Sequence, residues 1–305
     1  TQLLGLAHLF GSTSLSTAAS VDSMTTSNRV LGPVIVTGAS SGIGDAVCDR
    51  LAASGRKIIS VDRDEHGPTV GAENHYVCDL NNEIEVLRLF AELANDVDLS
   101  SVSSLINVAG VPGTEPASKV LEVNLLAIRR LSRFVASSFS PGSTIVNVGS
   151  ISGNGWQQRL DTYKALLALE DPEIRTWWTH WNRSVSVDPY SFSKEAVIVW
   201  SLLHSGELRG TGIRCNVVSP GPVDTPLLPT FREQIGDDRI NWVVSHSGRA
   251  AKPYEIAQAI EWLAVGESSW VNGHHLVVDG GYTSGLLSGW IDVQTAPTAK
   301  VTHID

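Results

Sequence analysis

The sequence of 305 residues predicts an α/β fold in which helices cover both faces of a single, doubly wound parallel sheet. Short apolar runs rich in β-branched residues alternate with amphipathic stretches from residue 33 to residue 285. A glycine-rich turn follows the first run, at the place where such folds bind ligands. Hydrophobic residues make up 42% of the chain and charged residues 18%, a composition that forms a core and argues against disorder.

Seven runs have the composition of buried strands. They are Val34–Thr37, Ile58–Val61, Tyr76–Cys78, Ser104–Val108, Thr144–Val148, Ile213–Val218 and His275–Val278. Amphipathic stretches with helical periodicity separate them, at residues 43–53, 83–95, 117–139, 190–208 and 254–265. This alternation predicts strands that run parallel, with ligands bound at their carboxyl ends.

The pattern is continuous from residue 31 to residue 288 and predicts one domain. The Ser/Thr-rich residues 1–30 predict a flexible leader, and they lack the basic segment of a secretory signal. Residues 154–186 carry no strand pattern and predict a helical insert within the domain. Residues 289–305 are polar, and we expect them to form a loose tail.

Charge and cysteine content narrow the possible functions. A formal charge of −10 and a pI near 5.3 disfavour binding to nucleic acid or to anionic membrane surfaces. No apolar run approaches the ~20 residues of a membrane span. The three cysteines form no CxxC pair, which fits a reducing cytoplasm. The nine histidines are scattered and form no cluster with cysteine, so we expect no metal site.

A glycine-rich turn joins the first predicted strand to the first predicted helix. Its glycines, Gly38, Gly42 and Gly44, allow a sharp turn and a close approach of backbone N–H groups to a phosphate. The N-terminus of the helix adds partial positive charge at the same place. The order of strand, glycine turn, helix and second strand predicts a dinucleotide-binding site.

Asp62 ends the second predicted strand, 18 residues after Gly44. A carboxylate at this position can accept hydrogen bonds from both hydroxyls of the NAD ribose, and it repels the additional phosphate of NADP. The neighbouring Arg63 favours NADP instead, because its positive charge can attract that additional phosphate. We expect NAD to be the preferred cofactor.

Tyr190 and Lys194 are four residues apart and therefore share one face of a predicted helix. A free tyrosine has a pKa of about 10, which is too high for a base at neutral pH. The charge of Lys194, together with that of an oxidised nicotinamide, favours the phenolate and lowers the pKa of Tyr190. The pair predicts Tyr190 as a general acid/base. Tyr163 does not qualify, because the fourth residue after it is Leu167.

Over residues 33–285, several segments in this order resemble the short-chain dehydrogenase/reductase superfamily. They are the glycine pattern Thr37–Gly44, Asp79, the segment Asn107–Gly110 (NVAG, where NNAG is common), Tyr190–Lys194 (YxxxK) and Pro220–Thr225. The resemblance implies a Rossmann fold, an NAD cofactor, and association into a homodimer or homotetramer. The cofactor site that we expect comprises Gly38, Ser40, Ser41, Gly42, Ile43, Gly44, Asp62, Arg63, Asp79, Leu80, Asn107, Ala109, Gly110, Tyr190, Lys194, Pro220, Gly221, Val223 and Thr225.

The same resemblance assigns roles to polar residues near the strand ends. Ser150 is expected to orient the substrate oxygen, and Ser152 is its rival two residues later. Asn124 matches the helix asparagine that holds a water in a proton relay to the lysine, although Ala127 stands where a glycine is frequent. A polar residue that merely bends the helix is the alternative for Asn124. The expected catalytic set is Asn124, Ser150, Tyr190 and Lys194.

The spacing between Ser150 and Tyr190 is 40 residues, longer than in many members of the superfamily. An insert at this place resembles the branch that contains 3α-hydroxysteroid dehydrogenases, carbonyl reductases and coniferyl-alcohol dehydrogenases. Strings similar to the last group are NVAGVPGT from Asn107, KEAVIVWS from Lys194, PGPVDTPL from Pro220 and ESSWVNGHHLVVDGG from Glu267.

The insert carries three tryptophans, Trp177, Trp178 and Trp181. With the segment Leu227–Lys252, we expect them to form an apolar wall for an aromatic or polycyclic alcohol. Ser152 and Leu227 are expected to contact the same substrate. The alternative for the tryptophans is core packing or contact between subunits.

The sequence therefore predicts an NAD-dependent alcohol dehydrogenase that oxidises an aromatic or allylic alcohol, such as coniferyl alcohol, to its aldehyde. Within the same branch, the alternative substrate is a 3α-hydroxysteroid or another cyclic secondary alcohol. A non-catalytic NAD-binding regulator is a more distant alternative, which the complete set of Asn, Ser, Tyr and Lys disfavours.

Overall fold

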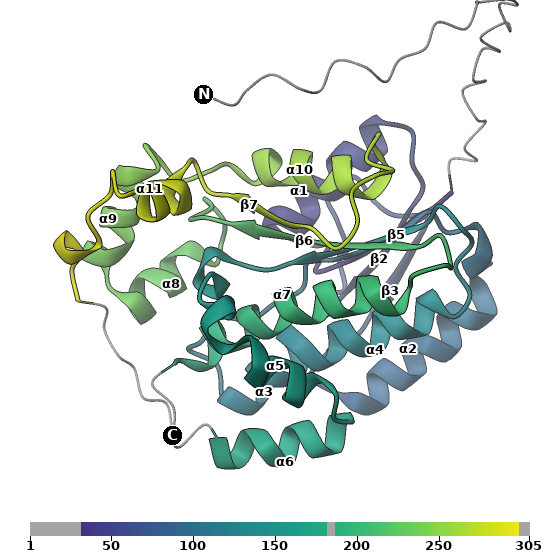
Figure 1. The fold of residues 1–305 in the computed structure, drawn as a ribbon. Coiled ribbons are helices and arrows are strands. Elements are labelled where there is room, and N and C mark those ends of the chain that lie inside the picture. Colours follow the sequence, from purple (N-terminus) through teal and green to yellow (C-terminus); the bar gives the residue numbers. More distant parts are fainter. Residues whose placement is uncertain (1–31, 182–186, 299–305) are drawn as a thin grey trace, which may run out of the picture. The chain divides into compact units, whose positions relative to one another are not determined.

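The computed structural model describes residues 32–181 and 187–298 of the chain. Its sheet contains seven parallel strands in the order β3-β2-β1-β4-β5-β6-β7 (Figure 1). The predicted doubly wound parallel sheet is confirmed. Because the chain reverses its progression across the sheet between β1 and β4, a crevice opens at their carboxyl ends, where ligands bind in such folds.

All seven predicted strands are present. They are β1 Val34–Thr37, β2 Ile58–Asp62, β3 Asn74–Val77, β4 Ser104–Asn107, β5 Thr144–Val148, β6 Arg214–Pro220 and β7 His275–Val278. Every residue of β1, β4, β5 and β6 is buried, as expected for strands covered on both faces. The predicted start of β3 was two residues late, because this edge strand begins with the polar, partly exposed Asn74 and His75. The predicted end of β6 was two residues early, because the strand continues through Ser219 and Pro220.

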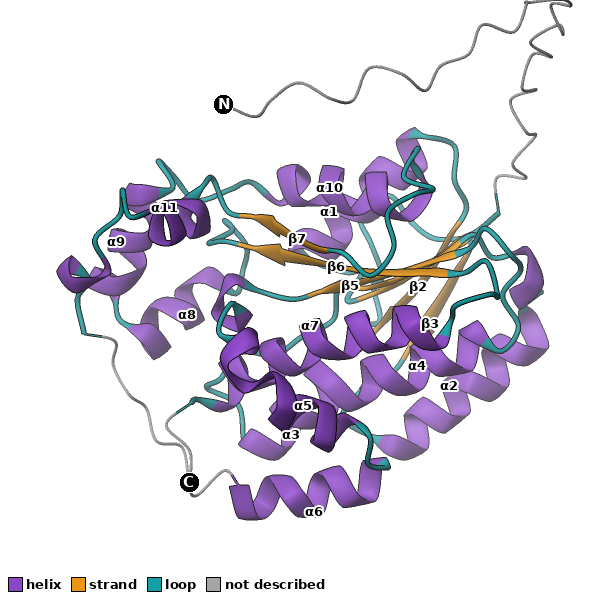
Figure 2. Cartoon of the chain, viewed as in Figure 1, coloured by secondary structure: helices purple, strands orange, loops and turns teal. Residues whose placement is uncertain are grey.

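Helices cover both faces of the sheet. They are α1 Gly42–Ala53, α2 Glu83–Asp96, α3 Ala117–Leu121, α4 Ala127–Ala136, α5 Leu160–Leu167, α6 Asp171–Trp181, α7 Pro189–Glu207, α8 Leu228–Ile235, α9 Asp237–His246, α10 Pro253–Val265 and α11 Tyr282–Ser288. Helices α1 and α10 lie on one face, and α2, α4 and α7 lie on the other (Figure 2). None of the helices in the described ranges combines the length and apolar character needed to cross a membrane.

The single helix predicted over residues 117–139 is interrupted. A π-helical turn, Glu122–Leu126, separates α3 from α4. Asn124 lies in this turn with no exposed surface, and its side chain bonds the backbone of Val111 in both directions. Turns of this kind inside α-helices frequently occur at functional sites.

The insert is helical as predicted, and an aromatic cluster fixes it to α7. The Trp178 ring lies 4.9 Å from that of Phe192, and the Tyr163 ring lies 4.9 Å from the same residue. Trp178 is 3% exposed, and Tyr163 and Phe192 are fully buried. Trp177 stacks on Phe192 with a centroid distance of 5.8 Å. The side chain of Trp181 and residues 182–186 lie outside the described residues.

A buried carboxylate adds a polar link between the insert and α7. Glu195 accepts hydrogen bonds from Arg159, which directly precedes α5 in the insert, and from the hydroxyl of Tyr163 at 2.6 Å. Burial, reinforced by the negative charge of Glu195, raises the pKa of Tyr163. Tyr163 therefore remains a phenol with a structural role, which agrees with its exclusion as a base.

The tail is not loose where the structure describes it, contrary to the prediction. Ile291 is 3% exposed and packs with Val243 and Tyr282. Gly285 makes room for it, because a Cβ at that position would lie 2.5 Å from the Cδ1 of Ile291. The prediction failed because one apolar residue among polar neighbours gives no periodic signal. Residues 1–31 and 299–305, which contain the predicted leader and the end of the tail, lie outside the described residues.

The packing of the insert generates a stability prediction. Trp178→Ala should lower the free energy of unfolding by about 3–5 kcal/mol, because it leaves a cavity in the aromatic cluster. Trp270→Ala is the matched control, since Trp270 is 99% exposed and its loss should change stability by no more than about 0.5 kcal/mol. Denaturant unfolding of both variants provides the measurement, and equal effects would show that the cluster does not anchor the insert.

Candidate active site

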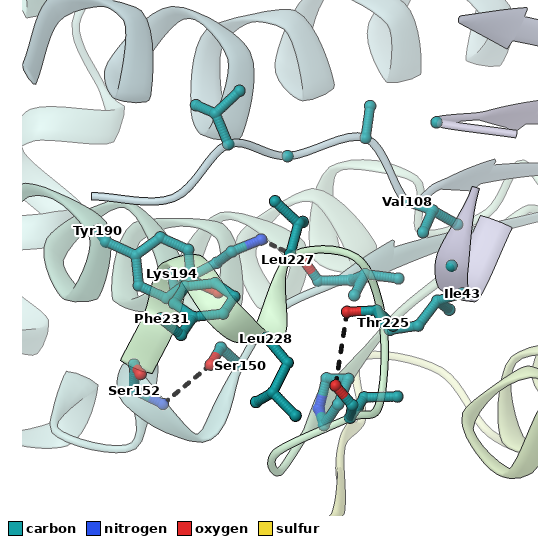
Figure 3. Close-up of a pocket in the computed structure, with 18 of the residues that line it drawn as sticks. Ile43, Val108, Ser150, Ser152, Tyr190, Lys194, Thr225, Leu227, Leu228 and Phe231 are labelled. Carbon is teal, nitrogen blue, oxygen red and sulfur yellow. Dashed lines mark hydrogen bonds between the residues drawn. The ribbon is translucent and has the colours of Figure 1, made fainter. Parts of the chain in front are cut away.

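A cleft with a volume of about 770 Å³ opens at the carboxyl ends of the strands. The glycine turn, the ends of β1, β2, β4, β5 and β6, the start of α7, and helices α8 and α9 contribute its walls. Figure 3 shows the part where Ser150, Tyr190 and Lys194 come together beneath side chains of the α8 segment. The cleft thus brings together residues that lie far apart in the sequence.

The glycine turn leaves no room for side chains. Gly38 has a φ of +67°, and a Cβ there would lie 2.7 Å from the backbone of Ala109. Gly42 has a φ of +56° and lies against Thr225. Gly38 and Gly42 both line the cleft, so their bare backbone forms a cradle that a phosphate group can approach closely. This cradle fits the predicted dinucleotide.

Asp62 lies at the far end of this cradle, half-buried at the end of β2. Its carboxylate accepts a hydrogen bond from the backbone N–H of Ser40 at 2.9 Å and another from that of Asp64 at 3.1 Å. A carboxylate has about four acceptor sites, so lone pairs remain for ribose hydroxyls. Arg63 is exposed and also lines the cleft.

Three residues of the expected cofactor site, Ser40, Gly44 and Asn107, do not line the cleft, and their contacts support the residues that do. The hydroxyl of Ser40 is buried, and its N–H is bonded to Asp62. Gly44 packs on the turn itself, because a Cβ there would lie 1.9 Å from the carbonyl oxygen of Gly38. Asn107 is buried in the sheet, where its amide donates to Asn147 at 2.8 Å. The others line the cleft as expected: Gly38, Ser41, Gly42, Ile43, Asp62, Arg63, Asp79, Leu80, Ala109, Gly110, Tyr190, Lys194, Pro220, Gly221, Val223 and Thr225.

The first turns of α7 position Tyr190 and Lys194. Asp188 caps the helix through the N–H of Ser191, and Pro189 begins it, a frequent arrangement at helix starts. The ammonium group of Lys194 is 5.7 Å from the centroid of the Tyr190 ring, and it donates to the carbonyl of Val148 at 3.0 Å. The predicted pair therefore shares one helix face, and the lysine is anchored to the end of β5.

Burial shifts both members of this pair away from their charged forms. It raises the pKa of Tyr190 to about 12, while the hydrogen bond from Ser150 acts in the opposite direction. It also lowers the pKa of Lys194 to about 8. At neutral pH most Lys194 side chains remain protonated and supply positive charge beside the phenol. Of the two serines, Ser150 is the one whose hydroxyl lowers the pKa of Tyr190. Ser152 also lines the cleft, and it donates its backbone N–H to the Ser150 hydroxyl at 3.1 Å.

Asn124 does not line the cleft, but it lies directly behind it. Its amide donates to the carbonyl of Val111 at 3.0 Å and to the hydroxyl of Ser193 at 3.2 Å. A Cβ on Gly110 would lie 3.3 Å from the Asn124 oxygen and 3.5 Å from the Lys194 nitrogen, so both side chains converge on Gly110. The site contains the four expected catalytic residues within one region.

The substrate end of the cleft has an aromatic and aliphatic wall. The ring of Phe231 on α8 lies 5.1 Å from that of Tyr190, with Leu227 and Leu228 on the same segment (Figure 3). The segment that begins at Leu227 therefore lines the cleft beside Tyr190, and its contact with the substrate stays a prediction. The expectation for Trp177 and Trp178 is wrong, because these two rings of the insert pack on Phe192 of α7 and do not line the cleft. Their alternative role in core packing is the one observed.

Sequence reasoning missed individual residues of this wall. Phe231, Gln234 and Arg239 line the cleft from α8 and α9. The side chain of Gln234 is buried and accepts a hydrogen bond from the N–H of Gly113 at 3.1 Å, which ties α8 to the loop after β4. The sequence showed only that the segment carrying α8 and α9 follows the end of a strand. The residue pattern of that segment does not indicate which of its side chains face the cleft. No group of three or more His, Cys, Asp or Glu in the described part of the chain is arranged to hold a metal.

Comparisons with known proteins agree with this site. A short chain dehydrogenase model matches residues 33–165, and a model described as Enoyl-(Acyl carrier protein) reductase matches residues 182–283. A coniferyl-alcohol dehydrogenase from Pseudomonas sp. strain HR199 is 34% identical over 82% of this chain and 96% of that protein. Carbonyl reductase family member 4 from Xenopus tropicalis is 30% identical over 81% of this chain and 95% of its own. The crystal structure of the 3-alpha-hydroxysteroid dehydrogenase from Pseudomonas sp. B-0831 with NADH has a TM-score of 0.70 and 28% identity, and covers 85% of this chain and 99% of that one.

The parallel sheet, the glycine cradle and the Ser–Tyr–Lys site define an oxidoreductase that uses a nicotinamide cofactor and acts on CH–OH groups. The chain belongs to the short-chain dehydrogenase/reductase family. The resemblance in its motifs is thereby confirmed, and its substrates are small molecules.

The hydrogen bond between Ser150 and Tyr190 generates a prediction about pH. Ser150→Ala removes an interaction that lowers the pKa of Tyr190, so the rise of kcat/KM for alcohol oxidation should move to higher pH. A pH series of kcat/KM for the wild type and the variant measures the shift. A variant that loses rate while its profile keeps the same midpoint would limit Ser150 to orienting the substrate.

Proposed function

We propose that this protein is an NAD-dependent dehydrogenase that oxidises aromatic or allylic alcohols to aldehydes, with coniferyl alcohol as the leading candidate. The observation that carries the proposal is the aromatic wall at the catalytic tyrosine, where Phe231 lies 5.1 Å from the ring of Tyr190. A flat, apolar alcohol suits such a wall better than a sugar does. The 34% identity to a coniferyl-alcohol dehydrogenase supports the same substrate class.

In this mechanism, Ser150 and Tyr190 hold the alcohol oxygen. Tyr190 accepts the hydroxyl proton, and the Lys194 ammonium stabilises the phenolate that makes this transfer favourable. Asn124 and Ser193 support this pair from behind: Asn124 donates to the carbonyl of Val111 and to the Ser193 hydroxyl, and Ser193 donates to the backbone carbonyl of Tyr190. When bound, NAD supplies the acceptor for the hydride at its nicotinamide ring. The Gly38 and Gly42 cradle and Asp62 are the groups that would hold it.

The second candidate is a 3α-hydroxysteroid or another cyclic secondary alcohol. It is favoured by the structural match to a 3-alpha-hydroxysteroid dehydrogenase, of which this chain covers 99%. The cleft of about 770 Å³, which holds cofactor and substrate together, also admits a fused ring system. The chemistry at Tyr190 is the same for both candidates, so only the outer part of the cleft distinguishes them.

One experiment tests the proposed function. NAD reduction is followed with coniferyl alcohol, cinnamyl alcohol, small aliphatic alcohols and 3α-hydroxysteroids, each with wild type and Tyr190→Phe. The aryl-allylic alcohols should give the highest kcat/KM, and the variant should lose about 10²–10⁴-fold in rate, because it lacks the ionisable hydroxyl. A higher kcat/KM for the steroids would establish the second candidate. Near-normal turnover by the variant would remove Tyr190 from the mechanism.

Asp62 generates a prediction about cofactor choice. Wild type should favour NAD over NADP by about 5–150-fold in kcat/KM, the range of a coupling free energy of 1–3 kcal/mol. Asp62→Asn should reduce this preference, because the amide keeps an acceptor for the Ser40 N–H but removes the negative charge. Arg63→Leu is the paired variant, and it should weaken the use of NADP more than that of NAD. Equal or better kinetics of wild type with NADP would mean that Arg63 outweighs Asp62.

A further inference from the structure

One cation in the wall of the cleft has no role in the mechanism above. Arg239 on α9 is half-buried and lines the cleft together with its neighbour Ile240. Its Nη1 donates to the carbonyl oxygen of Pro297 at 3.2 Å, and its guanidinium lies 5.1 Å from the centroid of the Trp242 ring. Within residues 32–181 and 187–298, no carboxylate forms an ion pair with Arg239. A guanidinium has five N–H donors, so several remain for a ligand.

The other cations of the cleft are already accounted for. Lys119 forms an ion pair with Glu115 at 3.1 Å. Lys194 belongs to the catalytic set, and Arg63 lies at the cofactor end beside Asp62. The first turn of α9 carries two acidic residues, Asp237 and Asp238. Asp237 is bonded to Arg232 at 3.1 Å, and Asp238 is exposed and forms no ion pair with Arg239 within the described residues. Among the described residues, Arg239 is therefore the cationic side chain that lines the cleft away from Asp62 and is paired with no carboxylate and assigned no part in catalysis.

Its surroundings place Arg239 at the substrate end. Trp242 packs edge-on against Tyr282, and the cluster around Tyr282 includes Ile151, the residue that follows the catalytic Ser150. Tyr282 itself lines the cleft, as Arg239 does. Burial raises the pKa of Tyr282, the charge of Arg239 lowers it, and that of Asp279 raises it further. The glycine cradle and Asp62 belong to the opposite end of the cleft.

We infer that Arg239 binds an anionic group of the substrate, a carboxylate in the simplest case, at a position away from the reacting carbon. The inference rests on the proposed oxidation of aromatic or allylic alcohols. Within that class it adds a preference for a molecule with an acid group on the far side of the ring or chain over a neutral molecule with the same skeleton. Trp242 holds one face of the guanidinium, so its edge is pre-oriented for bidentate hydrogen bonds with a carboxylate. The protein has a net charge of −10, which repels anions. A cation in the wall of the cleft attracts an anionic substrate locally and so favours its entry into the cleft.

The test compares two alcohols that differ in charge, 4-(hydroxymethyl)benzoate and its methyl ester, with NAD as cofactor. Arg239→Leu should lower kcat/KM for the acid about 10–150-fold more than for the ester, the range of a charge-assisted hydrogen bond. Arg239→Lys should retain part of the preference for the acid. Arg232→Leu is the control, because Arg232 lies on the neighbouring helix and does not line the cleft. The loss for the acid should also be mimicked in wild type by high salt.

Arg239 could instead only clamp the tail through Pro297. In that case Arg239→Leu would lower the melting temperature and reduce kcat/KM for the acid and the ester by the same factor, which would overturn the inference.

A binding measurement separates this inference from the proposed function. Calorimetry of 4-methylbenzoate with the NAD-saturated protein needs no turnover. If 4-methylbenzoate binds to wild type and to Arg232→Leu but not to Arg239→Leu, the anion site is supported. This holds even if neither alcohol is oxidised, because a lack of turnover would reject only the proposed oxidation of aromatic alcohols. Failure of wild type to bind 4-methylbenzoate, or equal binding by Arg239→Leu, would overturn the anion site and leave the proposed function intact.

Discussion

The site depends on one buried contact, the hydrogen bond from the Lys194 ammonium to the carbonyl of Val148. This bond connects α7 to the carboxyl end of β5. It thereby fixes how far Tyr190, on the helix, lies from Ser150, which follows the strand. Tyr190 lies one helical turn before the lysine, and Ser150 lies two residues after Val148. Since burial disfavours the lysine's charge, this arrangement is stable only because the ammonium finds an acceptor in the strand end.

The π-helical turn serves the same region from the other side. It inserts Asn124 into the protein interior, where the side chain satisfies both the N–H and the carbonyl of Val111. The backbone after β4 could not otherwise run through the interior without unpaired polar groups. That backbone carries Gly110, on which Asn124 and Lys194 converge. A local irregularity in one helix thus lets a loop, a helix and a strand end meet at the catalytic lysine.

Features that depend on local sequence were predictable. The strands buried on both faces, the glycine turn and the Tyr190–Lys194 spacing follow from residue type and periodicity, and the structure places them as expected. What depends on tertiary contact was not predictable. The tryptophans of the insert could face either the cleft or the core, and only the position of Phe192 on α7 shows that Trp177 and Trp178 pack inward. The interruption of the helix at residues 122–126 arises from the bond between Asn124 and a distant loop, which no periodicity encodes.

Neighbouring residues on α7 serve two different parts of the molecule. Lys194 faces the strand end, while Glu195 faces the insert, where it is 1% exposed and bonded to Arg159 and Tyr163. Removing Arg159 or Tyr163 while the insert still covers Glu195 would leave this carboxylate buried with fewer partners, at a high cost in free energy. The order of the insert therefore depends on an ion pair and a hydrogen bond to the residue that follows Lys194. A substitution in the insert can thus disturb the start of α7 without touching the cleft.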